Sequence, residues 1–161
     1  MRREGALLAV IACLAGAPAA AECAPDVVDI RSVGSEVRFS VELADTPETR
    51  ARGLMYREEL PRSSGMLFIY DTPQRATFWM ENTPLPLDML FFDETGVLAG
   101  VHENAEPFSR DVIDGGDGIR YVLEINGGMA GMLGIAPGAE LRHPAIDPEI
   151  AVWPCPAEDA G

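Results

Sequence analysis

A carboxylate inside an apolar run is the first candidate for chemistry. In the segment LDMLFF (87–92), Asp88 shares one face of an extended chain with apolar side chains, and the other face is wholly apolar. A strand that is apolar on both faces is normally covered on both sides, so this carboxylate needs hydrogen bonds or a cation. Two compatible hypotheses follow. Asp88 accepts backbone N–H groups of the turn Asn82-Thr83-Pro84, or Asp88 and an arginine line a pocket.

Neutral polar and aromatic residues precede Asp88 in the chain. Asn82 and Thr83 carry donors and acceptors that need no ionisation, in a turn that two prolines make stiff. Such groups suit a neutral polar ligand, but they also commonly satisfy the local backbone. Trp79 is either a core residue, which we favour, or a stacking surface of the kind seen in sugar and peptide grooves.

Two further charged positions are candidate site residues. Arg57 clusters with Arg50 and Arg52 on or after a predicted helix. It either lies on a solvated face with weak ion pairs or holds an anion or a buried carboxylate. Glu124 is either an ordinary outward residue of a strand or the second carboxylate of a pair with Asp88. Because such a pair performs general acid/base catalysis in many enzymes, Asp88 and Glu124 are the catalytic candidates.

The composition excludes several classes of function. The chain contains no lysine, which excludes Schiff-base chemistry and a P-loop. Its two histidines and its cysteines do not have zinc-site spacing, and neither an EF-hand nor a nucleophile elbow occurs. We therefore expect no metal and no cofactor. The net charge is −14, which makes nucleic acid and anionic membrane surfaces poor partners.

The first 21 residues have the pattern of a secretory signal peptide. Arg2 and Arg3 form a positive region, an apolar stretch follows, and small residues end at Ala21, near which we expect cleavage. The apolar stretch is too short for a membrane span, so no integral span is expected. We predict a periplasmic or secreted protein, with a lipoprotein anchored through Cys13 as the alternative. Removing Arg2, Arg3 and Glu4 reduces the 12 basic and 26 acidic residues to ten and 25, a net charge of −15.

Two cysteines remain near the ends of the mature chain, Cys23 and Cys155. In an oxidising compartment an even pair of cysteines predicts a disulfide. The alternative is two unrelated thiols in flexible tails.

Period-2 patterns dominate the mature chain and predict a mainly β fold. Asp45 or Thr46 caps one short helix near residues 46–56, with Pro47 in its first turn. Short strands at this spacing are typical of a compact antiparallel β-sandwich or jelly-roll-like domain. The expected strands are 36–43, 65–70, 76–81, 87–92, 97–103, 119–125 and 139–143, with a helical turn in 127–135, a glycine-rich loop at 111–118, and tails at 22–29 and 144–161.

Several motifs together resemble one family. The run RGLMYREELPRSSGMLFIYDTPQRATFWMENTPLPLDMLFFDETG and the later segment YVLEINGGMAGMLGIAPGAEL resemble the DUF 192 family, a domain of unknown function. The resemblance covers about residues 30–142 and implies a compact β domain, here 30–143, that is often exported and has no established activity. Glu81 stands where the family usually has lysine. The family's characteristic polar positions fall on Arg57, Asn82, Thr83, Asp88 and Glu124.

We therefore predict an exported binding or accessory domain of the bacterial envelope. Its ligand is expected to be small and polar, or carbohydrate-like, although the link to carbohydrates is an analogy between folds. We expect a monomer whose partner is this ligand or an envelope component. The alternative is an enzyme, a hydrolase or isomerase with Asp88 and Glu124 as its acid and base, which we consider less well supported. The predicted ligand-binding residues, centred on Asn82 and Asp88, are Arg57, Trp79, Asn82, Thr83, Asp88 and Glu124.

Overall fold

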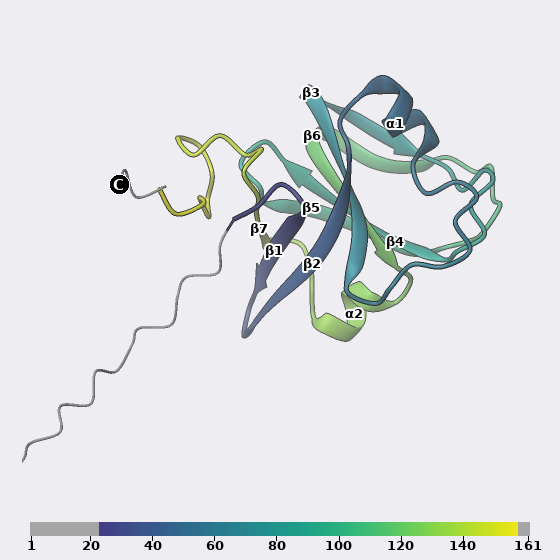
Figure 1. The fold of residues 1–161 in the computed structure, drawn as a ribbon, viewed down its shortest axis with the longest axis horizontal. Helices are drawn as coiled ribbons and strands as arrows, with labels where there is room; N and C mark the ends of the chain where they lie inside the picture. Colours follow the sequence, from purple (N-terminus) through teal and green to yellow (C-terminus); the bar gives the residue numbers. More distant parts are fainter. Residues whose placement is uncertain (1–22, 158–161) are drawn as a thin grey trace, which may run out of the picture.

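The computed structural model describes residues 23–157 of the chain (Figure 1). This part of the protein is mainly β, as predicted, and the helix expected near residues 46–56 is present as α1. In chain order the elements are β1 (Val27–Ser32), β2 (Ser35–Ala44), α1 (Pro47–Arg52), β3 (Ser64–Phe78), β4 (Leu87–Asp93), β5 (Leu98–Ala105), β6 (Ile113–Asn126), α2 (Met129–Leu133) and β7 (Glu140–Arg142).

The strands form one curled sheet in the order β5-β4-β6-β3-β2-β1-β7. Neighbouring strands are antiparallel except β2 and β3, which run parallel. Parallel neighbours need a crossover connection, and here the crossover contains α1. The sheet is thus mixed, where an antiparallel arrangement was predicted, because the chain passes through α1 before it returns to the sheet.

The curl brings the two edges of the sheet together. The N–H of Leu98 donates to the carbonyl of Ala139 (2.8 Å), and the N–H of Gly138 donates to that of Leu98 (2.8 Å). A third bond joins the N–H of Leu141 to the carbonyl of Gly96 (2.8 Å). β5 and β7 are the two edge strands, and because they meet here the curled sheet forms a half-barrel. Part of each edge is thus covered, whereas open edges can pair with another chain.

Both faces of the central strands are buried. Every residue of β4 from Leu87 to Phe92 is buried, as expected from an apolar pattern on both faces. One hydrophobic core includes Ala130 of α2, and a second includes Leu54, which follows α1. The sheet therefore separates two cores, and side chains that alternate along β4 or β6 enter different cores.

β3 and β6 are longer than the sequence pattern predicts. β3 contains the strand expected at 65–70 and the first half of the strand expected at 76–81, and it ends at Phe78. Most of the glycine-rich stretch expected as a loop (111–118) lies in β6. The register between these two strands shifts at three places. Gly116 and Gly118 have φ values of 87° and 72°. Such bulges interrupt the alternation of side chains, which is why the sequence pattern suggested breaks here.

β1 lies partly in a segment that was predicted to be a tail. The strand begins at Val27, whereas the tail was expected to extend over 22–29. The acidic residue Asp29 interrupts the apolar pattern of β1, yet it is only 3% exposed. Two arginines from other strands hold it, so its burial depends on residues distant in the sequence.

α1 ends at Arg52 rather than at residue 56. Thr46 and Thr49 form a capping box in which each hydroxyl accepts the other's N–H, at 3.2 and 3.0 Å. Gly53 has a φ of 49°, and its N–H donates to the carbonyl of Thr49 (2.9 Å). A Cβ at Gly53 would lie 3.2 Å from Cζ of Phe68, so this glycine lets the end of the helix approach the second core closely.

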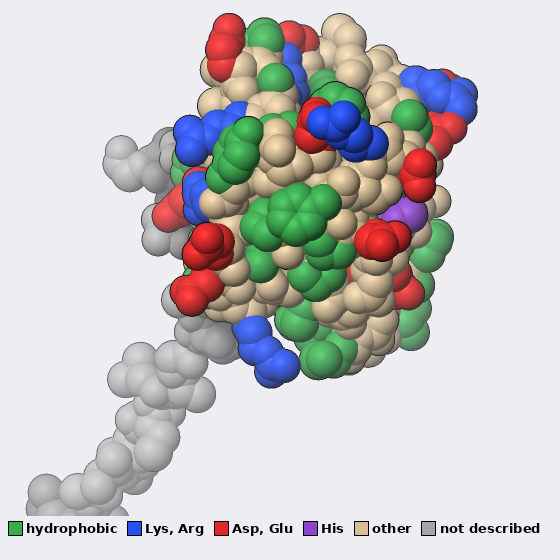
Figure 2. Space-filling view, turned by 90° about the vertical axis from the view of Figure 1, so that its right-hand side faces the viewer, with side chains coloured by type: hydrophobic (Ala, Val, Ile, Leu, Met, Phe, Trp, Pro, Cys, Tyr) green, Lys and Arg blue, Asp and Glu red, His purple; other side chains and the backbone are tan. Residues whose placement is uncertain are grey.

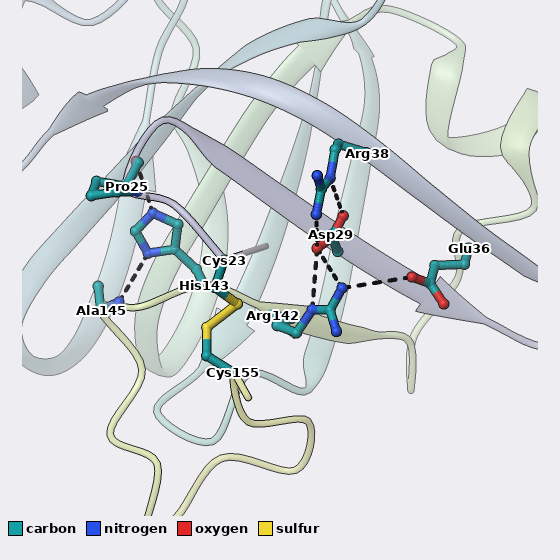
Figure 3. The surroundings of a disulfide bond; sticks show 9 residues. All are labelled: Cys23, Pro25, Asp29, Glu36, Arg38, Arg142, His143, Ala145 and Cys155. Carbon is teal, nitrogen blue, oxygen red and sulfur yellow. Dashed lines mark hydrogen bonds and ion pairs between the residues drawn. A yellow bond between two sulfur atoms is a disulfide. The ribbon is translucent and has the colours of Figure 1, made fainter. Parts of the chain in front are cut away.

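Cys23 and Cys155 form a disulfide, with their Cα atoms 5.8 Å apart (Figure 3). Beside it, Asp29 accepts hydrogen bonds from Arg38 (2.7 Å) and Arg142 (2.8 Å). Burial raises the pKa of Asp29, but the hydrogen bonds and charges of both arginines outweigh it, so the pKa lies below its usual value. The bridge thus joins the two ends of the described chain next to a buried ionic cluster.

The segment predicted as a C-terminal tail (144–161) is mostly exposed in its described part, but a few of its residues contact the sheet. Ile146 is 4% exposed and belongs to the first core. The guanidinium carbons of Arg31 and Arg142 lie 4.5 and 4.3 Å from the ring centroid of Trp153. Such cation–π contacts fasten the segment to β1 and β7.

The predicted signal peptide (1–21), its cleavage near Ala21 and the lipoprotein position Cys13 lie outside the described residues. Within residues 23–157, no helix has the length and apolar character needed to cross a membrane.

Candidate functional site

Asp88 is fully buried and satisfied by backbone groups. Its carboxylate accepts N–H bonds from Asn104, Gly128 and Ala130, each at 2.8 Å. Two of these donors belong to the start of α2, where a carboxylate is a favourable cap. Asp88 therefore accepts backbone N–H bonds, as one hypothesis stated, but the segment predicted to donate them was wrong. The donors come from the end of β5 and the start of α2, not from residues 82–84.

Asp88 and Glu124 point to opposite faces of the sheet. In the register of β4 and β6, Glu124 lies across from Met89, and Asp88 lies across from Ile125. Because consecutive side chains of a strand alternate between faces, the two carboxylates enter different cores. The structure does not bring them together as the acid and base of one catalytic pair.

Glu124 instead lines a pocket of about 260 Å³ between α1 and the sheet. α1 and the residues after it form one wall, and β3 forms the other. The volume is slightly below the roughly 300–1,000 Å³ typical of ligand pockets, so it suits one small group. The polar and aromatic residues that line it include Arg50, Tyr70, Thr77, Trp79, Thr83 and Glu124.

The carboxyl group of Glu124 lacks the partners that a buried carboxyl group needs. The residue is 4% exposed, and its buried Oε2 has no hydrogen-bond partner among the described residues. Its cross-strand neighbours are Met66 and Met89. Burial raises the pKa of Glu124 to about 8, because the charged form loses its hydration. At neutral pH the group is mostly protonated, so it has one O–H donor and free acceptor capacity.

Arg50 and Arg52 line this pocket, whereas Arg57 was the arginine predicted. Nη1 of Arg50 donates to the carbonyls of Asp45 and Ile69, each at 2.7 Å. Its Cζ lies 5.6 Å from the ring centroid of Tyr70, and burial raises the pKa of that tyrosine. These contacts fix Arg50 against the pocket wall.

Arg57 pairs with Glu42 on the surface, at 2.8 and 2.5 Å, and does not line the pocket. The helix predicted near residues 46–56 would include Arg50 and have Arg57 directly after it, but α1 ends at Arg52. Arg57 therefore belongs to the following turn, and its direction does not follow from helical spacing.

The turn at Asn82 and Thr83 joins the pocket to two neighbouring segments. The carbonyl of Asn82 accepts the N–H of Tyr56 (2.7 Å), and the carbonyl of Thr83 accepts the N–H of Phe108 (3.1 Å). Thr83 is buried and lines the pocket, and Trp79 lines it while remaining 49% exposed. The core interpretation that we favoured for Trp79 is therefore incorrect.

The structure thus gathers three of the six predicted binding residues, Trp79, Thr83 and Glu124, at one pocket. Asn82 lies in the adjoining turn, and Asp88 and Arg57 lie elsewhere. Arg50, Tyr70 and Thr77 also line the pocket and were not among the residues predicted from the sequence. Arg50 was visible as part of a basic cluster, but Tyr70 and Thr77 resemble ordinary strand residues.

A second hollow, of about 480 Å³, lies between the β1–β2 turn and residues 134–140. Its charged residues, Arg31 and Glu140, pair with each other. Backbone and small side chains form most of its lining, so it lacks the buried polar group that distinguishes the Glu124 pocket.

Known proteins place the chain in a family but do not supply an activity. The DUF 192 family, described as "Uncharacterized ACR", matches residues 28–143. One similar solved structure is the crystal structure of a candidate transcription regulator from Sinorhizobium meliloti. Its sequence is 40% identical to this one and its TM-score is 0.71, and the match covers 74% of this chain and 94% of that chain. A second crystal structure, of a protein of unknown function from Novosphingobium aromaticivorans, has a sequence 38% identical and a TM-score of 0.70. This match covers 71% of this chain and 82% of that chain. No curated protein matches the chain. The match over residues 28–143 shows that this chain belongs to the DUF 192 family.

Proposed function

We propose that this protein is an exported binding protein that holds a small polar ligand in the Glu124 pocket. The single observation that carries the proposal is the carboxyl group of Glu124, buried at the pocket wall with no partner for Oε2 in residues 23–157. A buried polar group without a hydrogen bond lowers stability. A ligand that supplies the missing bond recovers that loss on binding.

Other pocket residues support binding rather than catalysis. Thr83 and Thr77 are neutral hydrogen-bonding residues, and Trp79 and Tyr70 are aromatic. This mixture of an apolar wall and a few polar groups is typical of small-molecule sites. Acid/base catalysis by a carboxylate pair has less support, because Asp88 lies on the other face of the sheet.

Export is the second part of the proposal. The pattern of residues 1–21 supports it, and so does the disulfide between Cys23 and Cys155, since such bridges persist in oxidising compartments. Expression of the full chain in a bacterium, followed by fractionation, should give a periplasmic protein that begins at Glu22. A full-length product retained in the cytoplasm would contradict export.

A thermal-shift screen of the mature protein against small polar compounds tests the binding function. Compounds that raise the melting temperature should bind the parent protein and an Arg57→Ala control with equal affinity in calorimetry. They should bind Glu124→Leu at least tenfold more weakly, because leucine fills the space without a polar group. If every bound compound retains its affinity for Glu124→Leu, the pocket is not the binding site and the proposal is wrong.

A further inference from the structure

Three bulky or polar residues in left-handed backbone conformation meet beside the Glu124 pocket. Tyr56, Asn82 and Phe108 have φ values of 63°, 55° and 62°. Residues with a Cβ rarely adopt this region, and an aromatic residue there is an outlier. The N–H groups of Tyr56 and Phe108 donate to the consecutive carbonyls of Asn82 and Thr83. One short turn therefore holds both aromatic residues in place.

This backbone arrangement keeps aromatic rings in solvent. The exposed fractions are 71% for Tyr56, 64% for Phe108 and 49% for Trp79. We call these three residues the aromatic rim. Figure 2 shows hydrophobic side chains gathered near the middle of the face on the side of α1 and β4. Strained conformations persist where the surrounding structure imposes them, and they concentrate at functional sites.

Trp79 connects the aromatic rim to the pocket, because it belongs to both. The pocket holds about 260 Å³, which is enough for one small group but not for an extended molecule. A ligand that fills the pocket and also contacts the aromatic rim must therefore continue out of the pocket. This geometry suits a chain-like ligand whose end unit enters the pocket and whose following units lie on the aromatic rim.

The charges around the site favour a neutral chain. Arg50 and Arg52 of α1 line the pocket, so a cationic ligand would meet like charges. The whole chain carries a net charge of −14, which disfavours a polyanion. Among the ligands that remain, a neutral unit fits the lining well if it combines hydroxyl or amide groups, for Glu124 and Thr83, with flat apolar faces for the aromatic rings.

We infer that the pocket and the aromatic rim together bind a neutral oligosaccharide, whose terminal ring enters the pocket beside Glu124 and whose following rings stack on the aromatic rim. Sugar rings fit this description because their C–H faces are apolar and their edges carry hydroxyl groups. This inference rests on the proposed function and names the ligand class of the same site.

A glycan array probed with the mature protein tests the inference first, because it presents neutral and charged oligosaccharides together. Neutral glycans should be bound, and the best of them should then be measured by calorimetry. Trp79→Ala, Tyr56→Asn and Phe108→Asn should each weaken binding roughly three- to tenfold, the range expected for one aromatic contact. Asparagine adopts the left-handed region readily, so it removes the ring while preserving the backbone.

Val33→Asn is the matched control, because Val33 is fully exposed but lies in the β1–β2 turn, away from this site. It should leave glycan binding unchanged. Glu124→Leu should weaken glycan binding at least tenfold. Circular dichroism and the melting temperature confirm that each variant is folded.

The outcomes separate the inference from the proposed function. If only charged glycans bind, or none do, the oligosaccharide inference is wrong. If small polar compounds bind through Glu124 while the asparagine variants of the aromatic rim bind neutral glycans as well as the parent does, the inference fails and the proposed function stands. If neither glycans nor small polar compounds depend on Glu124, both fail.

Discussion

Asp88 and Glu124 lie on adjacent strands of one sheet, and their side chains enter cores on its opposite faces. Asp88 has three backbone donors, whereas Oε2 of Glu124 has no partner among the described residues. Two buried carboxyl groups in similar apolar strands thus have different roles. Asp88 stabilises the fold by fixing the start of α2 to β4, and Glu124 offers unused hydrogen-bonding capacity to a pocket.

Replacing Asp88 with asparagine should destabilise the protein by at least about 2 kcal/mol. The amide offers one acceptor oxygen, and its NH₂ group would face N–H donors that are then left unsatisfied, which is costly in a buried site. Urea unfolding measures the free energy of unfolding. The exposed residue Asp26 supplies the matched control, since Asp26→Asn should change it by less than about 0.5 kcal/mol. Equal stability of Asp88→Asn and the parent would refute the structural role.

Glu124→Gln should change the pH dependence of stability. The pKa of Glu124 is about 8 in the folded protein, raised by burial from 4.5. Between these values the unfolded chain releases a proton that the folded protein retains, so the parent loses stability as the pH rises, by up to about 1.4 kcal/mol per pKa unit. The variant lacks this loss. The free energy of unfolding of Glu124→Gln minus that of the parent should therefore increase from pH 4.5 to about pH 8 and then level off.

Parallel stability curves for Glu124→Gln and the parent across this range would show that Glu124 titrates normally. Chemical unfolding at several pH values provides the comparison. Glu58→Gln removes a carboxyl group at an exposed position outside the pocket and serves as the control.

Removing the disulfide should cost several kcal/mol. Cys23 and Cys155 are 132 positions apart, and closing a loop of this size is worth about 4–5 kcal/mol in the chain-entropy model. Cys23→Ser/Cys155→Ser should unfold at lower urea concentration, and its C-terminal segment should be cleaved faster by protease because Trp153 is less firmly held. Dithiothreitol should reproduce both effects in the parent and have none in the double variant. Two reactive thiols in secreted parent protein would contradict the bridge.

Gly53→Ala should weaken both stability and ligand binding. Gly53 has φ 49° and ψ −136°, a conformation in which alanine costs about 1–3 kcal/mol, and the Cβ of alanine would lie 3.2 Å from the ring of Phe68, so the ring or the end of α1 beside the pocket must shift. Gly34→Ala is the comparison for a positive φ without a close contact, because Gly34 has a φ of 82° and open space around its Cβ position. Gly53→Ala should therefore lose more stability than Gly34→Ala. An equal loss would mean that the contact with Phe68 does not position α1.

The parts of the fold that the sequence predicted are those set by local patterns. The alternation in residues 36–43 marks β2, and Thr46 and Pro47 mark the start of α1, whereas the end of α1 was predicted too late in the chain. The long pairing of β3 with β6 was missed because its bulges interrupt the alternation. β1 was missed because the burial of Asp29 depends on Arg38 and Arg142, which lie on other strands.

The candidate site could be predicted only in part for a similar reason. Glu124 was selected as a possible partner of Asp88 and through the family resemblance, but the face that it occupies depends on the register of β6 with its neighbours. Arg57 was selected through the family resemblance, and Arg50, a member of the same basic cluster, was not; α1 ends between the two, at Arg52. The positive φ values of Tyr56 and Phe108 have no sequence signal, since aromatic residues rarely adopt them.

The titration of Glu124 itself, followed by carbon NMR of the side-chain carboxyl groups in labelled mature protein, tests the central claim most directly. The resonance that disappears in Glu124→Gln identifies the residue. The structure predicts a midpoint near pH 8 without ligand, because burial without a partner for Oε2 favours the protonated form. A midpoint near the ordinary value of 4.5 would mean that the carboxyl group is solvated or paired, and that the pocket lacks the unsatisfied group on which the proposed function depends.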